Sequence, residues 1–389
     1  MDVEAIRAQI PVCQRLTYLN TGWQGPSPRG VVEAVMECME YESFDGPTAR
    51  EVFAAGRLHM VKAKEQAGRL INATPEEMVL TSSTTEGLNI VLNGLDWNEG
   101  DEIIVCSLEH MSVMVPSLML NHRYGVQVKV LQFAPAEEHE SILSRIEEAI
   151  TPKTRIVFFS HIQYSTGLRM PAEGIRELTR QRGILMLVDS AQGAGHIALD
   201  MRQLDPEFYS FSGQKWLLGP SGTGALFVRR DMVPQLKPVR VSSRSTSFHD
   251  HLGNYEVEVD SIEKFPTTNP SHPLWAGFVD AVQFNLNAGP AEIEERILGL
   301  SDASKRQLAD LPGVQVTSPV EGPGRSGLVT FTVEGTEPPN VVDRMWDDHG
   351  IVCRQVSYPP AVRLSYSFFN TEEEVAKATT AISEIASTP

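Results

Sequence analysis

The sequence is short of cysteine, of basic residues and of long apolar runs, and each shortage excludes a class of protein. Its four cysteines, Cys13, Cys38, Cys106 and Cys353, are widely scattered. They form no CxxC pair and no Cys/His cluster with metal-ligand spacing, so we expect reduced thiols and no metal site. No apolar run approaches the roughly 18 residues that a membrane-spanning helix requires, so we expect no membrane partner.

The charge balance argues against a nucleic-acid partner. The 389 residues include 33 Lys and Arg against 50 Asp and Glu, which gives a formal net charge of −17. Nucleic-acid binding requires basic patches, and this composition offers few cations for them. Residues 1–16, MDVEAIRAQIPVCQRL, contain early acidic residues and no apolar core, unlike a signal peptide. We therefore expect a soluble, cytoplasmic protein.

Short β-rich runs alternate with helical patterns over much of the chain. Near-continuous apolar runs indicate strands buried on both faces at 101–106, 126–133, 155–162, 184–190 and 223–230. Helical patterns lie between them at 84–94, 112–123, 140–150 and 172–182. This alternation predicts an α/β fold with a mostly parallel sheet flanked by helices. Such sheets bind ligands beyond the carboxyl ends of their strands.

The pattern changes after about residue 280, where a long helix is expected over 273–311, with Gly289-Pro290 as the place where it could break. Strands follow at 314–319, 326–333 and 361–367, with a helix at 339–349 and a last helix capped by Thr371 and Glu374. We therefore predict a large domain at 16–280 and a small α+β domain. The small domain comprises 281–389, and residues 1–15 pack on it.

Two residues of opposite charge suggest a site. Asp189 ends the apolar run of LVDSAQGAGH (187–196), and Lys215 follows the small residues of YSFSG. Alone, Asp189 is more typical of a helix cap or buried ion pair, and Lys215 of a surface lysine. Together, among hydroxyls and glycines, they suit pyridoxal phosphate. The lysine would form a Schiff base, and the aspartate would keep the pyridinium nitrogen protonated.

The phosphate of this cofactor needs hydroxyls, backbone N–H groups and a helix N-terminus. The stretch LTSSTTEGLNIVL (80–92) offers four consecutive hydroxyls where an amphipathic helix begins. An ordinary Ser/Thr helix cap is the alternative interpretation, but a cap does not need four hydroxyls. Ser212, three residues before Lys215, could add another donor.

A longer signature surrounds the aspartate and the lysine. The pattern D-x-A-Q-x-x-G-H is present from Asp189 to His196, and S-G-x-K-W-x-x-G-P-x-G-x-G from Ser212 to Gly224. From about residue 15 the chain resembles the class V aminotransferase branch of the fold-type I pyridoxal-phosphate enzymes. That branch includes cysteine desulfurases, cysteine/cystine C–S lyases, selenocysteine lyases and isopenicillin N epimerase-like proteins. The resemblance implies an amino-acid substrate and a homodimer with active sites at the subunit interface.

The resemblance also implies roles for single residues that contact the cofactor. Thr84 and Thr85 match the phosphate-binding TTE, and His110 matches the histidine that stacks on the cofactor ring. Gln192 matches the glutamine that hydrogen-bonds the phenolic oxygen of the cofactor. Gln214 stands where relatives have a phosphate-binding histidine, and its amide could still donate. Asp189, Lys215 and His110 are the expected catalytic residues, with Lys215 as general base.

A further set matches residues that contact the substrate or the partner subunit. Arg363, in VRLSYSFFNTEEEV, matches the arginine that binds the substrate α-carboxylate. In FPTTNP (265–270), Thr268 or Asn269 corresponds to the residue that reaches the phosphate of the partner subunit. The expected pocket wall is formed by Trp23 and Tyr164, and Arg244 is the weaker candidate for a second anionic contact.

The presence or absence of one nucleophilic cysteine distinguishes the reactions of this family. A desulfurase carries a nucleophilic cysteine shortly before the carboxylate-binding arginine, but no cysteine lies between Arg354 and Arg363. Cys353 lies on an expected strand, where we expect it to pack as a small hydrophobic residue and not to act as a nucleophile. We therefore expect a C–S lyase that converts cysteine, cystine or a cysteine S-conjugate into a thiol or persulfide, pyruvate and ammonia. The alternatives are an aminotransferase or epimerase acting on a natural-product intermediate, then a desulfurase, then a non-catalytic protein.

Overall fold

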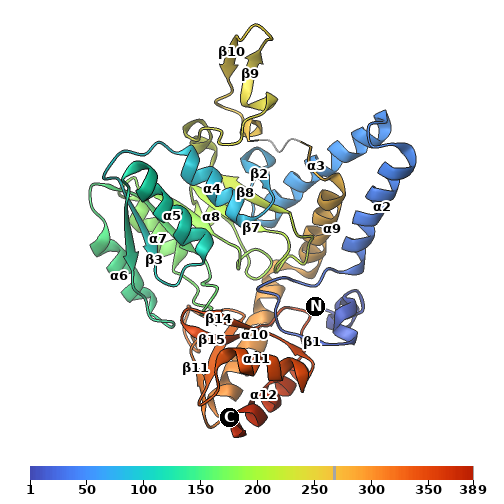
Figure 1. Ribbon diagram of the computed structural model, residues 1–389, viewed down its shortest axis with the longest axis vertical. Coiled ribbons are helices and arrows are strands. Elements are labelled where there is room, and N and C mark those ends of the chain that lie inside the picture. The colour runs from blue at the N-terminus through green and yellow to red at the C-terminus, as the bar shows by residue number, and fades with distance from the viewer. Residues whose placement is uncertain (266–268, 389) are drawn as a thin grey trace.

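The computed structural model describes residues 1–265 and 269–388, and it confirms the α/β fold with a mostly parallel sheet. A seven-stranded sheet forms the centre of the molecule (Figure 1). In sheet order the strands are β2 (Met78–Thr81), β8 (Gly224–Val228), β7 (Phe208–Ser212), β6 (Leu185–Asp189), β5 (Thr154–Ser160), β3 (Glu102–Cys106) and β4 (Gln127–Leu131). Strand β8 runs antiparallel to β2 and β7, and the other pairs are parallel.

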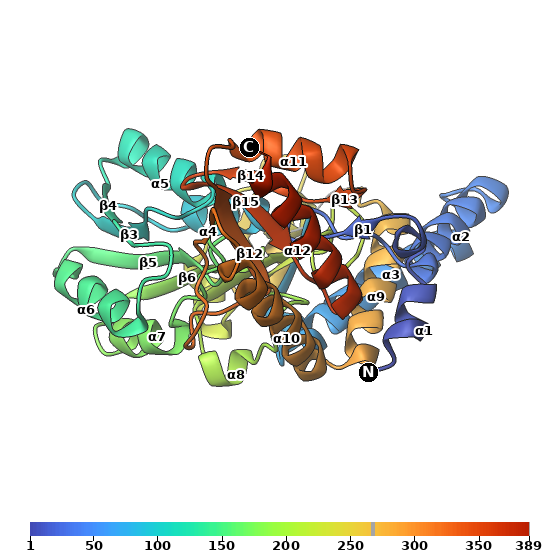
Figure 2. The same ribbon diagram turned by 90° about the horizontal axis from the view of Figure 1, so that it is seen from below.

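Alternate side chains of the central strands enter two separate apolar cores. In β5, Val157 and Phe159 belong to one core, whereas Ile156 and Phe158 belong to the other. The helices of the first core are α3 (Arg50–Leu70), α6 (His139–Ala149), α7 (Ala172–Arg180), α8 (Met201–Leu204) and α9 (His272–Ala288), and those of the second are α4 (Thr84–Gly94) and α5 (Met111–Tyr124). Figure 2 shows α5 on one side of the strands and α6, α7 and α8 on the other. A strand covered on both faces needs apolar residues at every position, which is why the sequence shows continuous runs.

The C-terminal part contains a four-stranded antiparallel sheet. Its order is β11 (Val314–Val316), β12 (Leu328–Val333), β15 (Pro360–Ser365) and β14 (Arg354–Ser357), and it packs with α10 (Pro290–Ala309), α11 (Pro338–Asp347) and α12 (Glu372–Ser387). The break in the long helix is confirmed, because Gly289, with φ of +84°, separates α9 from α10. The capping box of Thr371 and Glu374 is also present.

The N-terminal residues contact this C-terminal part. Strand β1 (Thr17–Tyr18) pairs in parallel with β13 (Ile351–Val352). In α1 (Val3–Ala8), Arg7 forms an ion pair with Glu374 at 3.1 Å. The exact division into two domains stays a prediction. In the described part of the chain, no helix combines the length and apolar character that crossing a membrane requires.

Two hairpins were not expected from the sequence. The helices α2 (Arg29–Asp45) and α3 form one of them, and both pack on α9. The short strands β9 (Thr246–His249) and β10 (Tyr255–Val257) form the other, which projects at the top of Figure 1. Residues at the exposed surface of such elements give little apolar periodicity, so the sequence pattern did not reveal them.

The turn after β6 lies against the backbone that carries Lys215. Gly195 has a φ of +81°, and a Cβ at this position would lie 2.7 Å from the carbonyl carbon of Trp216. It would also lie 2.8 Å from the backbone nitrogen of Leu217. Backbone atoms cannot swing away as a flexible side chain can. Any side chain at position 195 would therefore displace the lysine-bearing segment.

Gly195→Ala should destabilise the protein more than Gly183→Ala does, because Gly183 also has positive φ (+65°) but open space around it. The left-handed backbone conformation alone costs about 1–2 kcal/mol. The contact at Gly195 should add a further cost of about 1–3 kcal/mol. Urea denaturation of both variants measures the difference. Equal losses in the two variants would contradict the described contact.

Candidate active site

A pocket of about 380 Å³ lies at the carboxyl ends of β5, β6 and β7. This is the position at which open α/β sheets bind their ligands. The structure brings together eleven of the residues expected there: Trp23, Thr84, Thr85, His110, Tyr164, Asp189, Gln192, Ser212, Gln214, Lys215 and Arg363. These residues come from segments far apart in the sequence, so the fold alone assembles them.

Asp189 and Lys215 both line this pocket. Asp189 ends β6 and is 2% exposed. Its Oδ1 accepts from the Ala191 backbone at 2.8 Å, and its Oδ2 accepts from the Ser112 hydroxyl at 3.3 Å. Burial raises the pKa of Asp189, while the hydrogen bond from Ala191 and the charge of Lys215 oppose that rise. The aspartate is thus a buried acceptor with a cation beside it.

Lys215 is prepared to act as a neutral amine. Burial lowers its pKa to about 8, Asp189 opposes the shift, and the nearby Arg363 and Arg354 add to it. A lysine with an ordinary pKa is almost fully protonated at neutral pH and is a weak nucleophile. The lowered pKa makes a free amine available close to physiological pH.

Several buried polar atoms of the pocket lack a partner within the described chain. They are Thr84 Oγ1, Ser212 Oγ and Gln214 Oε1. Thr84 opens α4, where backbone N–H groups have no partner in the helix. The Thr84 hydroxyl at this helix N-terminus and the Ser212 hydroxyl at the end of β7 fit the phosphate of the expected cofactor. The buried, unpartnered atom of Gln214 is its amide oxygen, which can only accept, so Gln214 would donate to phosphate only with its amide turned over.

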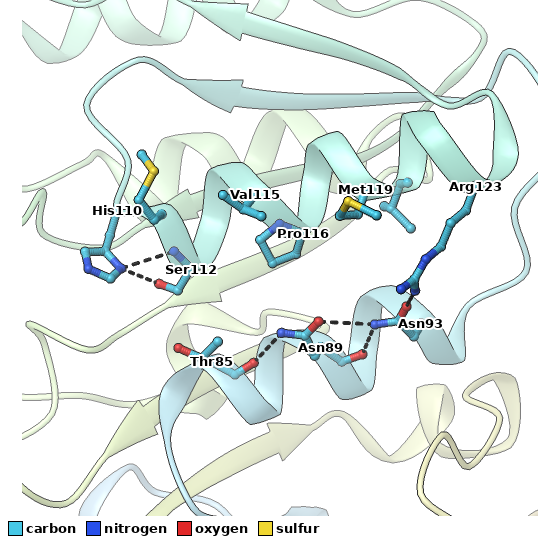
Figure 3. A pocket seen from close by; sticks show the side chains of 11 residues that line it. Thr85, Asn89, Asn93, His110, Ser112, Val115, Pro116, Met119 and Arg123 are labelled. Carbon is cyan, nitrogen blue, oxygen red and sulfur yellow. Dashed lines mark hydrogen bonds between the residues drawn. The ribbon is translucent and has the colours of Figure 1, made fainter.

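His110 lies at the N-terminus of α5, at the junction of this pocket and a second groove (Figure 3). Its Nδ1 accepts from the Ser112 backbone at 3.1 Å. Burial, with Lys215 nearby, lowers the pKa of His110, so the ring is neutral at pH 7. Its edge meets the Tyr164 ring, with the two centroids 5.0 Å apart. A neutral ring held in this way is suited to stacking on an aromatic cofactor.

Gln192 is already held by two protein groups. Its Nε2 donates to the Gly22 carbonyl and its Oε1 accepts from Trp216 Nε1, both at 2.8 Å. The amide has a second N–H, and only this hydrogen remains for the phenolic oxygen of a cofactor. The expected contact is therefore possible in one orientation of the side chain.

Two arginines face each other across the hairpin of β14 and β15. Arg354 and Arg363 are direct cross-strand partners, and both line the pocket. Arg363 is 1% exposed and donates to the Tyr164 carbonyl at 2.8 Å, but its Nε and Nη2 have no partner in the described chain. Burial and the charge of Arg354 lower the pKa of Arg363 to about 9. Like charges directly opposite are unfavourable, so an anion would stabilise this pair.

Two expected residues do not line this pocket, and a third cannot be placed relative to it. Arg244 forms an ion pair with Glu263 at 2.7 Å and does not line it. Asn269 is exposed and does not line it either, and Thr268 lies outside the described residues. A role at the site for Arg244, Thr268 or Asn269 stays a prediction.

Sequence reasoning missed three residues of the site or its surroundings: Ser112, Arg354 and Glu109. The spacing of Ser112, two residues after His110, was a usable signal because a helix begins there. Arg354 was visible only as the neighbour of Cys353, since its approach to Arg363 depends on the register of the hairpin.

The family model for aminotransferase class-V matches residues 23–377. The chain belongs to the aminotransferase class V family. Class V relatives match it over almost their whole length. A probable cysteine desulfurase of Methanothermobacter thermautotrophicus is 28% identical, covering 99% of this chain and 98% of the relative. An isopenicillin N epimerase of Amycolatopsis lactamdurans is also 28% identical, with 98% of each chain covered.

Two solved structures are similar to this chain in fold over nearly its whole length. The cystine C–S lyase C-DES, in complex with its reaction product cysteine persulfide, gives a TM-score of 0.91 at 27% identity. The match covers 97% of this chain and 99% of C-DES. A lysine-to-alanine mutant of C-DES, with glycine covalently linked to the PLP cofactor, gives a TM-score of 0.91 at 26% identity and the same coverage.

The lowered pKa of Lys215 predicts how the apoprotein reacts with pyridoxal phosphate. The rate should rise as the pH increases towards about 8 and level off above that value, because the neutral amine is the reacting form. Stopped-flow measurement of the visible absorbance of the Schiff base follows the reaction. Lys215→Ala, which cannot form this Schiff base, should not develop that absorbance. A rate that keeps rising to pH values typical of a free lysine, about 10, would contradict the lowered pKa.

Proposed function

We propose that the chain is a pyridoxal-phosphate-dependent C–S lyase that catalyses β-elimination on cystine or a related cysteine S-conjugate. The products are a persulfide or thiol, pyruvate and ammonia. The observation that carries this proposal is that no cysteine occurs among the described residues that line the pocket of Asp189, Lys215 and Arg363. A desulfurase needs a cysteine to take up sulfur, whereas elimination needs no protein thiol.

Cys353 is unsuited to act as that thiol. It is 7% exposed and packs in the core of the C-terminal part with Leu19 and Ile351. Burial raises its pKa to about 12, so the thiolate that could attack sulfur is not populated at neutral pH. The hairpin that follows is also tight, because Ser357 pairs with Pro360. It leaves no long loop on which a cysteine could reach the pocket.

The residues of the pocket fit pyridoxal phosphate, which when bound withdraws electrons from the substrate Cα. Asp189 would hold the protonated pyridinium nitrogen, and His110 would stack on the ring. Thr84 and Ser212 would donate to the phosphate, since their hydroxyls are buried without partners. Lys215 would attach the cofactor and, once displaced by the substrate amine, would accept the Cα proton. Its lowered pKa supports both roles.

The two arginines favour cystine over a neutral S-conjugate. Arg363 would bind the carboxylate of the amino-acid half that reacts. Arg354 lies directly opposite, with its guanidinium 4.5 Å from the centre of the Trp23 ring. It could bind the carboxylate of the half that leaves. A substrate with two carboxylates would neutralise both cations, which one carboxylate cannot do equally well.

An epimerase or aminotransferase is the second candidate, and the match to isopenicillin N epimerase over nearly the whole chain favours it. Both reactions begin with the same proton abstraction at Cα, so Asp189, Lys215 and Arg363 would serve them equally. They differ from elimination in their products. An epimerase returns the inverted amino acid, and an aminotransferase requires a keto-acid acceptor.

We also propose that two copies form a homodimer, as the class V resemblance implies. Large apolar side chains are exposed along α2, where Met36, Met39 and Phe44 are 54%, 58% and 87% exposed. Burial of such residues against a second copy would be favourable. Sedimentation equilibrium tests this. The cytoplasmic location stays a prediction from the sequence.

Incubation with cystine should give pyruvate and ammonia in equal amounts without any added keto acid. Pyruvate is measured with lactate dehydrogenase and ammonia with glutamate dehydrogenase. Cys353→Ala should retain activity within about twofold, because its thiol lies outside the pocket. Product formation that depends on an added keto acid would refute elimination, and an inactive, folded Cys353→Ala variant would support a desulfurase.

Arg354→Gln should raise the KM for cystine by about tenfold, the effect of one lost charged hydrogen bond. The KM for S-methylcysteine, which has no second carboxylate, should stay within about twofold of the wild type. Steady-state pyruvate formation measures both values. An equal rise in KM for both substrates would show that Arg354 does not bind the second carboxylate.

A further inference from the structure

Glu109 has a buried carboxyl group beside the pocket, and the proposed reaction assigns no role to it. It precedes His110 between β3 and α5, and it is 3% exposed. Its oxygens accept from the Ser160 backbone at 3.0 Å, the Ser160 hydroxyl, Gln163 Nε2 at 2.8 Å and the Cys106 thiol at 3.2 Å. All of these donors are uncharged. A carboxylate buried among uncharged donors is costly, so its presence at this place calls for an explanation.

Two of the residues that donate to Glu109, Ser160 and Gln163, belong to a segment that runs from Ser160 to Leu168, called here the 160–168 segment. Ser160 ends β5, and Gln163 lies just beyond it. Burial raises the pKa of Glu109 to about 7, while the bonds from Ser160 and Gln163 oppose this shift. The hydrogen bonds thus favour the ionised form, which accepts from all of its donors at once.

The 160–168 segment also carries the contacts that place two residues of the active site. Its Tyr164 presents the backbone carbonyl to Arg363 Nη1 at 2.8 Å. The Tyr164 ring meets the ring of His110, with centroids 5.0 Å apart. One short segment therefore touches both the expected cofactor-stacking histidine and the expected substrate-binding arginine.

The far end of the 160–168 segment is fixed to the C-terminal part of the chain. The Ser326 hydroxyl donates to the Gly167 carbonyl at 2.6 Å. Gly167 has a φ of +72°, and a Cβ there would lie 2.8 Å from the Leu328 carbonyl oxygen. Glu109 is the counterpart at the other end, where it ties the segment to the loop that carries His110.

We propose that Glu109 is a positioning residue whose carboxylate holds the 160–168 segment so that His110 and Arg363 face the same ligand in a fixed relation. This inference rests on the proposed function and extends it to a residue outside the pocket. Loss of the carboxylate should loosen both contacts of Tyr164 together. Cofactor binding and substrate binding should then weaken in parallel, although Glu109 touches neither ligand.

Glu109→Gln tests this, because the amide has the same shape but offers an N–H where the carboxylate accepts. The dissociation constant of pyridoxal phosphate from the apoprotein and the KM for cystine should both rise by about ten- to hundredfold, as expected when a reacting pair is misplaced. The matched control is Glu77→Gln, which alters another buried carboxylate, one bound to Arg202. This control should lower stability in urea and leave both binding constants unchanged. Wild-type constants in Glu109→Gln would overturn the proposal.

Gln163→Met keeps the carboxylate and removes a single link between it and the 160–168 segment. The KM for cystine should rise by about fivefold, and an unchanged KM would overturn the proposal even if Glu109→Gln did not fold. Glycine, which has no leaving group, separates this test from the proposed function. If wild-type protein releases no pyruvate from cystine, elimination is refuted. The spectroscopic dissociation constant of glycine then tests the role of Glu109 alone, and it should rise in both variants.

Discussion

Asp189 is taken out of water at the end of β6, and the backbone hydrogen bond from Ala191 and the positive charge of Lys215 offset part of the cost of that burial. The relation is reciprocal, because the aspartate also limits how far burial can lower the pKa of the lysine. The two residues come from adjacent parallel strands, β6 and β7, or from the turn that follows. Their proximity is therefore fixed by the sheet itself. Every other part of the pocket is arranged around this pair.

Cations outnumber anions among the charged groups that face the pocket. Among the described residues that line it, Lys215, Arg354 and Arg363 stand against one carboxylate, that of Asp189. Like charges gathered at a buried or half-buried place are unfavourable until a ligand supplies negative charge. A phosphate-bearing cofactor and the proposed substrate with two carboxylates would do so, and the cations at this place stand out in a protein with a net charge of −17.

The parts of the fold that were predictable are those whose physical cause is local. Buried strands need continuous apolar runs, and the helix break at Gly289 needs a residue that tolerates positive φ. The α2 helix escaped notice because it buries Val31 and leaves Met36 and Phe44 exposed, so it lacks a one-sided apolar stripe. The β9–β10 hairpin is almost wholly exposed and gives no pattern either.

The residues of the candidate site also divide into those whose position has a local cause in the sequence and those whose position does not. Asp189, Lys215 and Thr84 lie at ends of elements, where local sequence predicts their position. The approach of Arg354 to Arg363 depends on hairpin register, and the bonds of Gln192 to Gly22 and Trp216 depend on packing between distant segments. Sequence patterns record neither of these. Glu109 was not predicted because Ser160 and Gln163, which connect it to the 160–168 segment, lie more than fifty residues away.

Strand β8 runs against its neighbours, and this has a consequence for Lys215. In a parallel connection the chain would cross to the other end of the sheet before the next strand begins, but here the loop of residues 213–223 leads from β7 into β8 at the same end. The Gly213 backbone N–H donates to the Thr223 carbonyl at 2.9 Å. This hydrogen bond joins the two ends of the loop that carries Lys215. A lysine on a loop anchored at both ends has few conformations left. The entropy of fixing it is lost when the chain folds and not when a ligand binds.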